Sequence, residues 1–422
     1  MSRCKNNAVK KLKAHSPGQA ADILVEKFPL HLNPEQTLLA RNLQMEAAKV
    51  WNAACNIHRT IYGRYGYWLS EGAIKALLKG KYGLHSQSVQ AVVETYFECC
   101  ERTRELHLQG HTEWKYPYRR KRFFTVTWKK AAITHKGRIL KLSNGWGREP
   151  LMVKLPKRLT NAAILQAQLV WHRNQYWLHV TVEKPALLKV QGDVCAAIDP
   201  GEVHALTITD GNDALVISGR LLRSLNRLRN KVLRQLQRAI SKTKEGSRKR
   251  RKLLAKKYRF LNWIERRIEH ILHAISANAV RWCLGRSVRT VYIGNPEGVR
   301  ERDCGRHYNQ RMGQWAFGKL SDLLAYKLKR HGTELIQVDE RGTSGTCPVC
   351  GEYTRQTGRV YRCGDVSCGF TGIHRDVLGA SGILDKALHG SFTRGRRLPG
   401  KVEYLRPQVL APKRAVFKTY LR

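Results

Sequence analysis

The sequence has few acidic residues for its length. Asp and Glu number 32 against 77 Lys and Arg, which gives a formal net charge of +45 and a pI near 10.3. Such an excess would make a folded chain repel itself, so a polyanion is the natural partner. The basic residues are spread along the chain, which suggests extended nucleic-acid channels. A hydrophobic content of 42% excludes a disordered basic polypeptide.

Long apolar runs are also missing. No run approaches the roughly 18 residues of a membrane span, and the N-terminus, MSRCKNNAVKK, lacks a signal-peptide core. We therefore expect a cytoplasmic chain without a membrane partner. Its 422 residues suffice for two or three domains with a sizeable core.

Paired cysteines are absent outside one stretch. Seven of the eleven cysteines show no paired spacing except Cys99-Cys100, and we expect them to be reduced, with Cys55 and Cys195 in cores. The other four form a C-x2-C and a C-x4-C pair twelve residues apart: Cys347, Cys350, Cys363 and Cys368. Two close pairs can hold zinc in a tetrahedral thiolate cage. Disulfides or a chance cluster are the alternatives, but this spacing in a cytosolic chain favours a structural zinc ribbon.

Three acids lie at the ends of expected secondary structure. Asp199 ends an apolar strand, Glu340 follows ELIQV (334–338), which is typical of a buried strand, and Asp376 opens an expected helix. A four-thiolate zinc has no open coordination position, so these acids are the better candidates for chemistry. A carboxylate at a strand end can hold a divalent cation. For Asp199 alone, an ordinary D-P-G turn is an equal alternative.

The first half of the chain predicts β-structure with a helical insert. A strand is expected at 23–32, and Asn33 to Gln36 has the residues of a helix start. That helix should run to about His58, and a second one from Ser86 to Leu108. Alternating segments then predict an antiparallel barrel or sheet, with a hairpin tip at Asn174-Gln175; they lie at 139–142, 151–155, 164–171 and 176–183.

Two basic stretches are candidates for nucleic-acid binding. The first interleaves aromatic and basic side chains between residues 114 and 130 and includes Trp114, Tyr118, Arg119, Arg120, Lys121 and Arg122. Bases bind phosphates and aromatic faces stack on nucleobases, although a strand with its aromatics in the core is the alternative. The second links two long helices expected within 220–285 and includes Arg248, Lys249, Arg250 and Arg251. A solvated charge run is the usual interpretation of such a link.

The order of elements after residue 190 is three strands with an acid on the first, helix, strand, helix, strand, ribbon, acid and helix. It resembles a ribonuclease H-like nuclease of the RuvC type, and more narrowly the TnpB transposon-encoded nucleases and the miniature type V CRISPR effectors. The residues that carry the match lie within about 190–390: Ile198 to Glu202, Gln314-Trp315, Glu340 with Thr343-Ser344, Cys347, Cys350, His374 to Asp376, and Gly379-Ala380. The first half fits the family only loosely, through its opening strand, the Asn33 turn and Trp51-Asn52.

The resemblance implies an α+β multidomain fold with a wedge-like N-terminal β-barrel, a helical recognition insert and a RuvC-like α/β nuclease domain that carries an inserted zinc ribbon. The expected boundaries are 1–32 for the N-terminal arm and first barrel strand, 33–110 for the insert, 111–190 for the remaining barrel, 191–344 and 373–390 for the nuclease domain, 345–372 for the ribbon and 391–422 for a basic tail.

The resemblance also implies an RNA-guided DNA endonuclease, a metal-dependent hydrolase that reads a short DNA motif beside its target. Its partners would be a guide RNA and double- and single-stranded target DNA, with one or two copies per guide, in a prokaryotic cytoplasm and on the nucleoid. Asp199, Glu340 and Asp376 would hold Mg²⁺ or Mn²⁺, the cysteines Zn²⁺, and Arg375 is a candidate phosphate contact or an ordinary surface base.

One position departs from the family pattern. Many relatives carry the second acid at the end of the fourth strand, where this chain has Gly294, and Glu297 in the following turn is a poor substitute. Some relatives instead carry a glutamate just before the Thr-Ser pair, where Glu340 stands. The alternatives to a nuclease are an RNA-guided DNA-binding protein that does not cut and a resolvase or transposase that acts without RNA.

Overall fold

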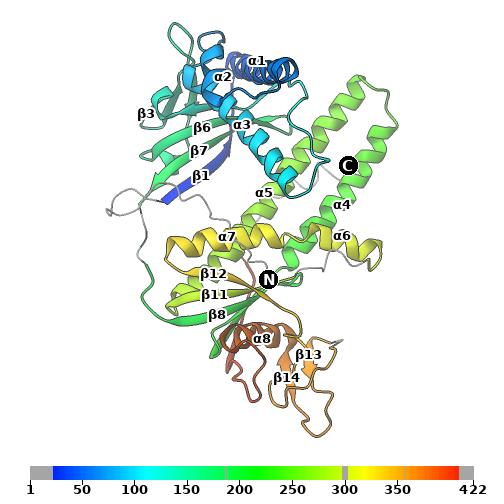
Figure 1. Ribbon diagram of the computed structural model, residues 1–422. Helices are drawn as coiled ribbons and strands as arrows, with labels where there is room; N and C mark the ends of the chain where they lie inside the picture. The colour runs from blue at the N-terminus through cyan, green and yellow to red at the C-terminus, as the bar shows by residue number, and fades with distance from the viewer. Residues whose placement is uncertain (1–21, 186, 188, 297–302, 357, 408–422) are drawn as a thin grey trace. The chain divides into compact units, whose positions relative to one another are not determined.

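The computed structural model describes residues 22–185, 187, 189–296, 303–356 and 358–407. The chain divides into two compact units, Met1–Ala186 and Leu187–Arg422 (Figure 1). Within the described ranges, every helix is too short or too polar to cross a bilayer. The expectations for residues 1–21, for Glu297 and for residues 408–422 fall outside these ranges.

The first unit packs helices on two antiparallel sheets. The helices are α1 (Pro34–Tyr65), α2 (Glu71–Leu78) and α3 (Ser86–Leu108), with short 3-10 turns η1 (Lys130–Ala132) and η2 (Lys157–Leu159). One sheet has the order β1-β7-β6-β2, from β1 (Asp22–Pro29), β2 (Val126–Lys129), β6 (Ala163–His172) and β7 (Gln175–Lys184). The other consists of β3 (Ile133–Lys136), β4 (Ile139–Leu142) and β5 (Leu151–Lys154). The pairings of these described strands do not confirm a closed barrel.

Local signals predicted most of this unit. Asn33 accepts a hydrogen bond from the Gln36 backbone N–H, and the Asn33 N–H donates to the Gln36 side chain, so the predicted start of α1 is confirmed. The helix passes the predicted end at His58 and stops at Gly66, whose φ of 72° favours glycine. The β6–β7 hairpin turns at Arg173 and Asn174, both with positive φ, one residue before the predicted tip.

The second unit is built on a six-stranded mixed sheet with the order β12-β11-β8-β9-β10-β15. Its strands are β8 (Val194–Asp199), β9 (His204–Thr209), β10 (Asp213–Ser218), β11 (Val288–Asn295), β12 (Glu334–Asp339) and β15 (Lys401–Leu405). The first three are antiparallel, whereas β11 pairs with β8 and β12 in parallel. A mixed α/β multidomain architecture is thus confirmed.

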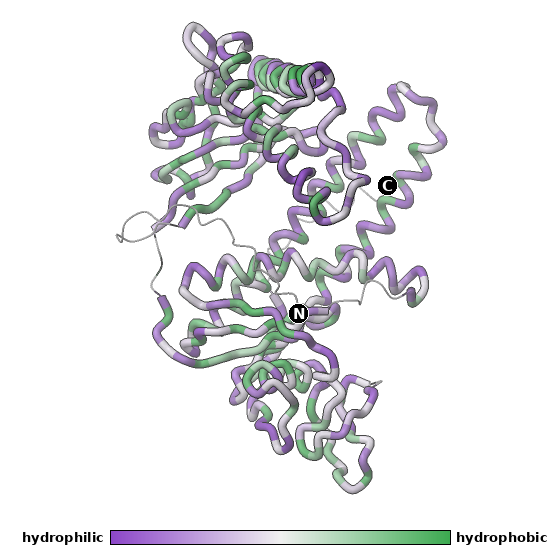
Figure 2. The backbone as a smooth tube through the Cα atoms, viewed as in Figure 1, coloured by the Kyte–Doolittle hydropathy of each residue, from purple (hydrophilic) through white to green (hydrophobic). Residues whose placement is uncertain are grey.

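Helices cover both faces of this sheet. The helices α5 (Arg248–Leu284) and α7 (Phe317–Arg330) bury one apolar face around Ile198 and Ile293, and α8 (Arg375–His389) packs on the other across β8, β9, β11 and β12. The remaining elements are α4 (Arg220–Ser241), α6 (Arg306–Gln314), β13 (Val360–Arg362) and β14 (Thr371–His374). Figure 2 shows the α4–α5 hairpin as largely hydrophilic and the strands of the sheet as mostly apolar.

Two expectations for this unit were wrong. The strand β12 was expected to be buried, but it lies at the edge of the sheet with most of its side chains exposed. Residues 391–422 were expected to be a basic tail outside the nuclease domain, but Lys401–Leu405 form β15, which pairs in parallel with β10. Both errors concern pairing between distant segments, which the apolar pattern of one segment does not reveal.

Candidate active site

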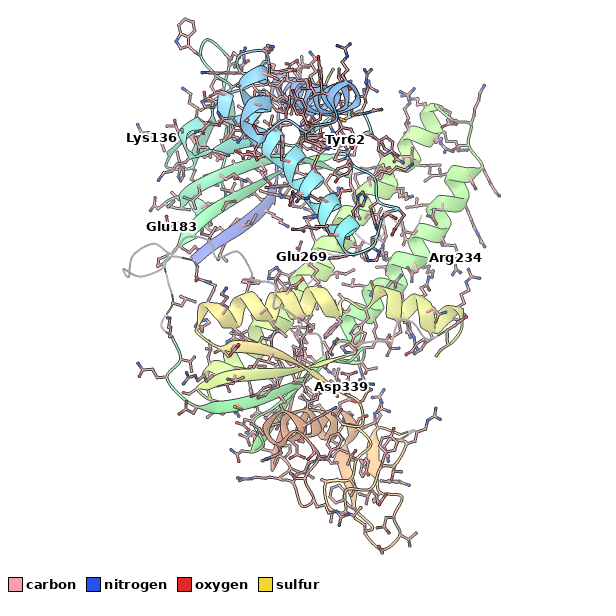
Figure 3. The ribbon with its side chains drawn as sticks, in the orientation of Figure 1. Tyr62, Lys136, Glu183, Arg234, Glu269 and Asp339 are labelled. Atoms are coloured by element: carbon pink, nitrogen blue, oxygen red, sulfur yellow. The ribbon has the colours of Figure 1, made fainter. Side chains whose placement is uncertain are left out.

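The three predicted acids lie at neighbouring ends of the second unit's sheet. Asp199 is the last residue of β8, Glu340 follows β12 directly, and Asp376 is the second residue of α8. Because β11 separates β8 from β12 and α8 packs across these strands, the elements bring the acids to one end of the sheet. Asp339, labelled at this end in Figure 3, is the residue before Glu340.

The pKa of Asp199 indicates that each of the other two acids lies near it. Burial raises the pKa of Asp199 well above its ordinary value, and the carboxylates of Asp376 and Glu340 raise it further, while Arg375 opposes them. The approach of α8 depends on Gly379, because a Cβ there would lie 2.6 Å from Asp199 Oδ2. Among the described residues, the carboxylate oxygens of the three acids do not all lie within 4.8 Å of one another.

The Glu340 side chain fills the space next to Gly294, the position at which the resemblance places the second acid of many relatives. A Cβ at Gly294 would lie 2.7 Å from Glu340 Oε2. This oxygen is buried without a hydrogen-bond partner, and burial, with Asp339, raises the pKa of Glu340 to about 7. A buried, unpaired carboxylate oxygen beside other acids fits a site for a hard divalent cation.

Asp376 differs from the other two acids in its surroundings. Burial alone would raise its pKa, but the hydrogen bond from His204 and the nearby His374 and Arg375 outweigh that effect, and the pKa is lowered. The His204 Nδ1 and Asp376 Oδ2 atoms are 2.8 Å apart. Sequence reasoning missed His204, and its place at the start of β9, directly after the turn that follows Asp199, was the available signal.

The four cysteines converge as predicted. Their sulfur atoms all lie within 4.8 Å of one another, with 3.8 Å between Cys347 and Cys368 and 3.6 Å between Cys350 and Cys363. Thiolates about 2.3 Å from a tetrahedral zinc are roughly 3.8 Å apart, whereas a disulfide needs about 2.05 Å. The arrangement therefore fits a metal ion.

The predicted aromatic and basic stretch divides into a loop and a core strand. Tyr118, Arg119, Arg120, Lys121 and Arg122 are exposed on the loop between α3 and β2, as is Trp114. Two hydrogen bonds between the Asn52 side chain and the Lys121 backbone, 2.8 and 2.9 Å long, fix this loop to α1. Trp128 is 0% exposed in β2, so the core alternative holds at that position.

The second basic run begins α5. Arg248, Lys249 and Arg251 are exposed, but Arg250 donates to the backbone carbonyls of Ile240 and Thr243 and so closes the end of α4. Arg375 is half exposed, with its Nε 4.0 Å from Asp376 Oδ1.

Two family models match the chain. The description of one is Cas12f1-like, TNB domain, and it matches residues 317–383; that of the other is Probable transposase, and it matches residues 178–300. The second model covers β8, which carries Asp199. The first covers β12, which directly precedes Glu340, and the segment with the four cysteines and Asp376.

Curated relatives and a solved structure agree with these models. The chain is 28% identical over 144 residues to TnpB-like protein MJ0751 of Methanocaldococcus jannaschii, covering 33% of this chain and 50% of the relative. It is 26% identical over 138 residues to TnpB-like protein ORF457 of Acidianus two-tailed virus, covering 32% and 28%. The chain thus spans half or less of the length of these relatives. A Cas12f1–sgRNA–target DNA complex has a TM-score of 0.60 at 15% identity and covers 83% of each chain.

The fold and the grouped acids and cysteines define a mixed α/β multidomain protein of the kind seen in Cas12f1. Within that class, the family models, the curated relatives and the fold support a TnpB-like protein or miniature type V effector, the resemblance that the Asp199, Glu340 and Asp376 motifs predicted.

Proposed function

We propose that this protein is an RNA-guided DNA endonuclease. The observation that carries the proposal is the cluster of Asp199, Glu340 and Asp376, in which each of two acids raises the pKa of Asp199. Such mutual repulsion is relieved by cations, and divalent cations at carboxylate clusters serve phosphodiester hydrolysis. The strand order, with β8 central and β11 beside it, supports a ribonuclease H-like domain, and the pairing of β15 with β10 extends that domain past the expected end at residue 390.

The same acids would hold Mg²⁺ or Mn²⁺, since carboxylate oxygens suit hard cations and the thiolates suit zinc. When bound, two such ions activate a water and stabilise the leaving oxygen. Asp199, Glu340 and Asp376 would hold the ions together, and Asp199 is the acid whose pKa both others raise. Arg375, which is half exposed and has its Nε 4.0 Å from Asp376 Oδ1, would hold the scissile phosphate.

Nucleic-acid partners are supported by charge and by fold. A formal charge of +45 suits a chain that keeps an RNA bound, and the Cas12f1 structure of similar fold contains an sgRNA and target DNA. Guide pairing would supply sequence specificity, while the protein reads duplex geometry and a short motif. One or two copies would assemble per guide, in the cytoplasm or on the nucleoid.

The test is plasmid cleavage by the full-length protein with its guide and Mg²⁺. RNA that copurifies with the protein is sequenced to define the guide, and a plasmid carrying the matching target is the substrate. Cleavage that needs guide, target and metal together supports the proposal. Binding without cleavage would indicate an inactive RNA-guided binder, and cleavage without RNA a transposase-like nuclease.

Replacing Gly294 by Ala is expected to lower the cleavage rate at least about tenfold. The new methyl group would collide with Glu340 Oε2 at 2.7 Å and Ile383 Cδ1 at 2.8 Å, so Glu340 must move. Overpacking of this kind costs about 1–3 kcal/mol. The control is Gly63→Ala in α1, where nothing lies within 4 Å; it should leave cleavage unchanged. Equal rates for both variants would show that Glu340 does not need its present place.

Removing charge from the loop before β2 is expected to weaken guide-RNA binding. Arg119→Ala with Arg120→Ala should lower affinity and reduce the slope of log affinity against log salt by about 0.7–0.9 for each phosphate that the loop no longer neutralises. The matched control replaces two exposed lysines of the three-stranded sheet, Lys136 and Lys141, by alanine. Filter binding over a salt series measures both; equal slopes in the two pairs would count against a role for the loop.

A further inference from the structure

His204 is a largely buried side chain that the proposed chemistry leaves without a role. It begins β9, its side chain is 11% exposed, and its Nδ1 lies 2.8 Å from Asp376 Oδ2. Cation binding by the three acids does not by itself require a histidine at this place. We propose that His204 is a positioning residue, which holds the Asp376 carboxylate in place for its cation by donating the Nδ1–H to Oδ2.

The direction of this hydrogen bond follows from the partners. An ionised carboxylate only accepts, so the imidazole must donate, and the neutral ring then carries its proton on Nδ1. The other nearby histidine is occupied differently: His374 Nδ1 accepts from the Asp376 backbone N–H at 3.2 Å and lies 4.0 Å from Oδ2. Of these two rings, His204 is therefore the one that holds the carboxylate.

The ring of His204 is itself held. Its centroid lies 5.0 Å from that of His374, edge to face, and 6.5 Å from that of Tyr404 in β15. Because His204 binds Oδ2, Oδ1 of Asp376 remains available to bind a cation. Arg375, the proposed phosphate contact, has its Nε 4.0 Å from this Oδ1. Partners that orient a ligating carboxylate typically contribute 10–100-fold in metal affinity or activity.

This inference rests on the proposed function, so its test includes a measurement that does not depend on cleavage. Mn²⁺ binding to the full-length protein, freed of nucleic acid, is followed by electron paramagnetic resonance for wild type, His204→Asn, His204→Gln and His204→Leu. The amide nitrogen of Asn sits where Nδ1 does, whereas that of Gln lies one carbon further out. We expect Asn to bind within about threefold of wild type, and Gln and Leu to bind about 10–100-fold more weakly.

Cleavage should follow the same order through kcat, with KM for the target unchanged. If all variants bind Mn²⁺ like wild type, or wild type itself does not bind, the proposal is wrong. If Asn is as weak as Leu, the imidazole is itself a ligand and the positioning role is also wrong. If the Mn²⁺ order holds but wild type does not cut DNA, the proposed nuclease function fails and the role of His204 stands.

Discussion

Asp199→Asn is expected to lower the rate of DNA cleavage by a factor on the order of 10³ or more, with guide and target affinities within about threefold of wild type. Asp199 ends the central strand β8 and is the acid whose pKa both other carboxylates raise. An amide keeps the size of the side chain but removes the negative charge that would hold the cations. Single-turnover cleavage and guide-dependent DNA binding, measured on the same preparation, separate the two effects.

The matched control is Asp193→Asn, which changes the same residue type six positions earlier. Asp193 is almost fully exposed and pairs with the surface Arg289 at 3.1 Å, and exposed pairs contribute about 0–1 kcal/mol. Cleavage by this variant should match wild type. Unimpaired cleavage by Asp199→Asn would show that this acid cluster is not where DNA is cut.

The same substitution should also change stability, in a direction that depends on pH. Because the folded pKa of Asp199 lies well above 3.8, wild type loses stability relative to Asp199→Asn as pH rises from the unfolded pKa through the folded one. Without metal, the variant should therefore be the more stable protein at pH 7, and the difference should vanish near pH 4. Mg²⁺ should stabilise wild type alone. Denaturant titrations at several pH values measure this.

Patterns within one segment predicted the parts of the fold and site that local chemistry determines. The cysteine spacing placed four sulfur atoms together, the Asn33 cap fixed the start of α1, and Asp199 and Asp376 were placed at a strand end and a helix start. Each of these signals lies in the same short segment as the feature it predicts, so no knowledge of distant parts of the chain was needed.

The features that sequence reasoning missed depend on contacts between distant segments. The exposed edge position of β12 depends on which strand stands at the end of the sheet, and β15 exists because residues after 400 reach β10. The short helix α6 gives little periodic signal over 9 residues. The close approach of Glu340 to Gly294 joins positions 46 residues apart, and the resemblance to the family, with the acid absent at Gly294, was what pointed to it.

Removing the metal ion that the four cysteines would hold should affect the acids as well as the ribbon. Cys347 and Tyr361 of the ribbon share a buried cluster with Leu378 of α8, two residues after Asp376. In the segment that follows α8, Arg396 donates a hydrogen bond to the Thr346 carbonyl at 2.6 Å. This bond connects that segment to the residue before the first cysteine pair. The ribbon is therefore packed on the helix that carries the third acid.

Cys347→Ser is expected to lose zinc and to lower cleavage about 100-fold. Structural zinc contributes about 10–16 kcal/mol of apparent binding free energy in small domains, so the ribbon should unfold without it. The unfolded segment would remain a loop of fewer than about 40 residues, whose closure entropy grows only slowly with length. Glu340 and Asp376 should then be displaced by the loss of packing at Leu378, which is why we expect a large reduction that is still smaller than the effect of Asp199→Asn.

Zinc content, measured by atomic absorption, and cleavage rate are compared with Cys304→Ser, which changes an exposed cysteine outside the ribbon. That control should keep both zinc and activity. Native-state hydrogen exchange should show loss of protection in residues 345–372 and in the first turns of α8 for Cys347→Ser, with α5 unchanged, because α5 packs on the opposite face of the sheet. A Cys347→Ser protein that still holds one zinc and cuts DNA normally would show that the four thiolates are not the metal site, and that α8 keeps Asp376 in place without the ribbon.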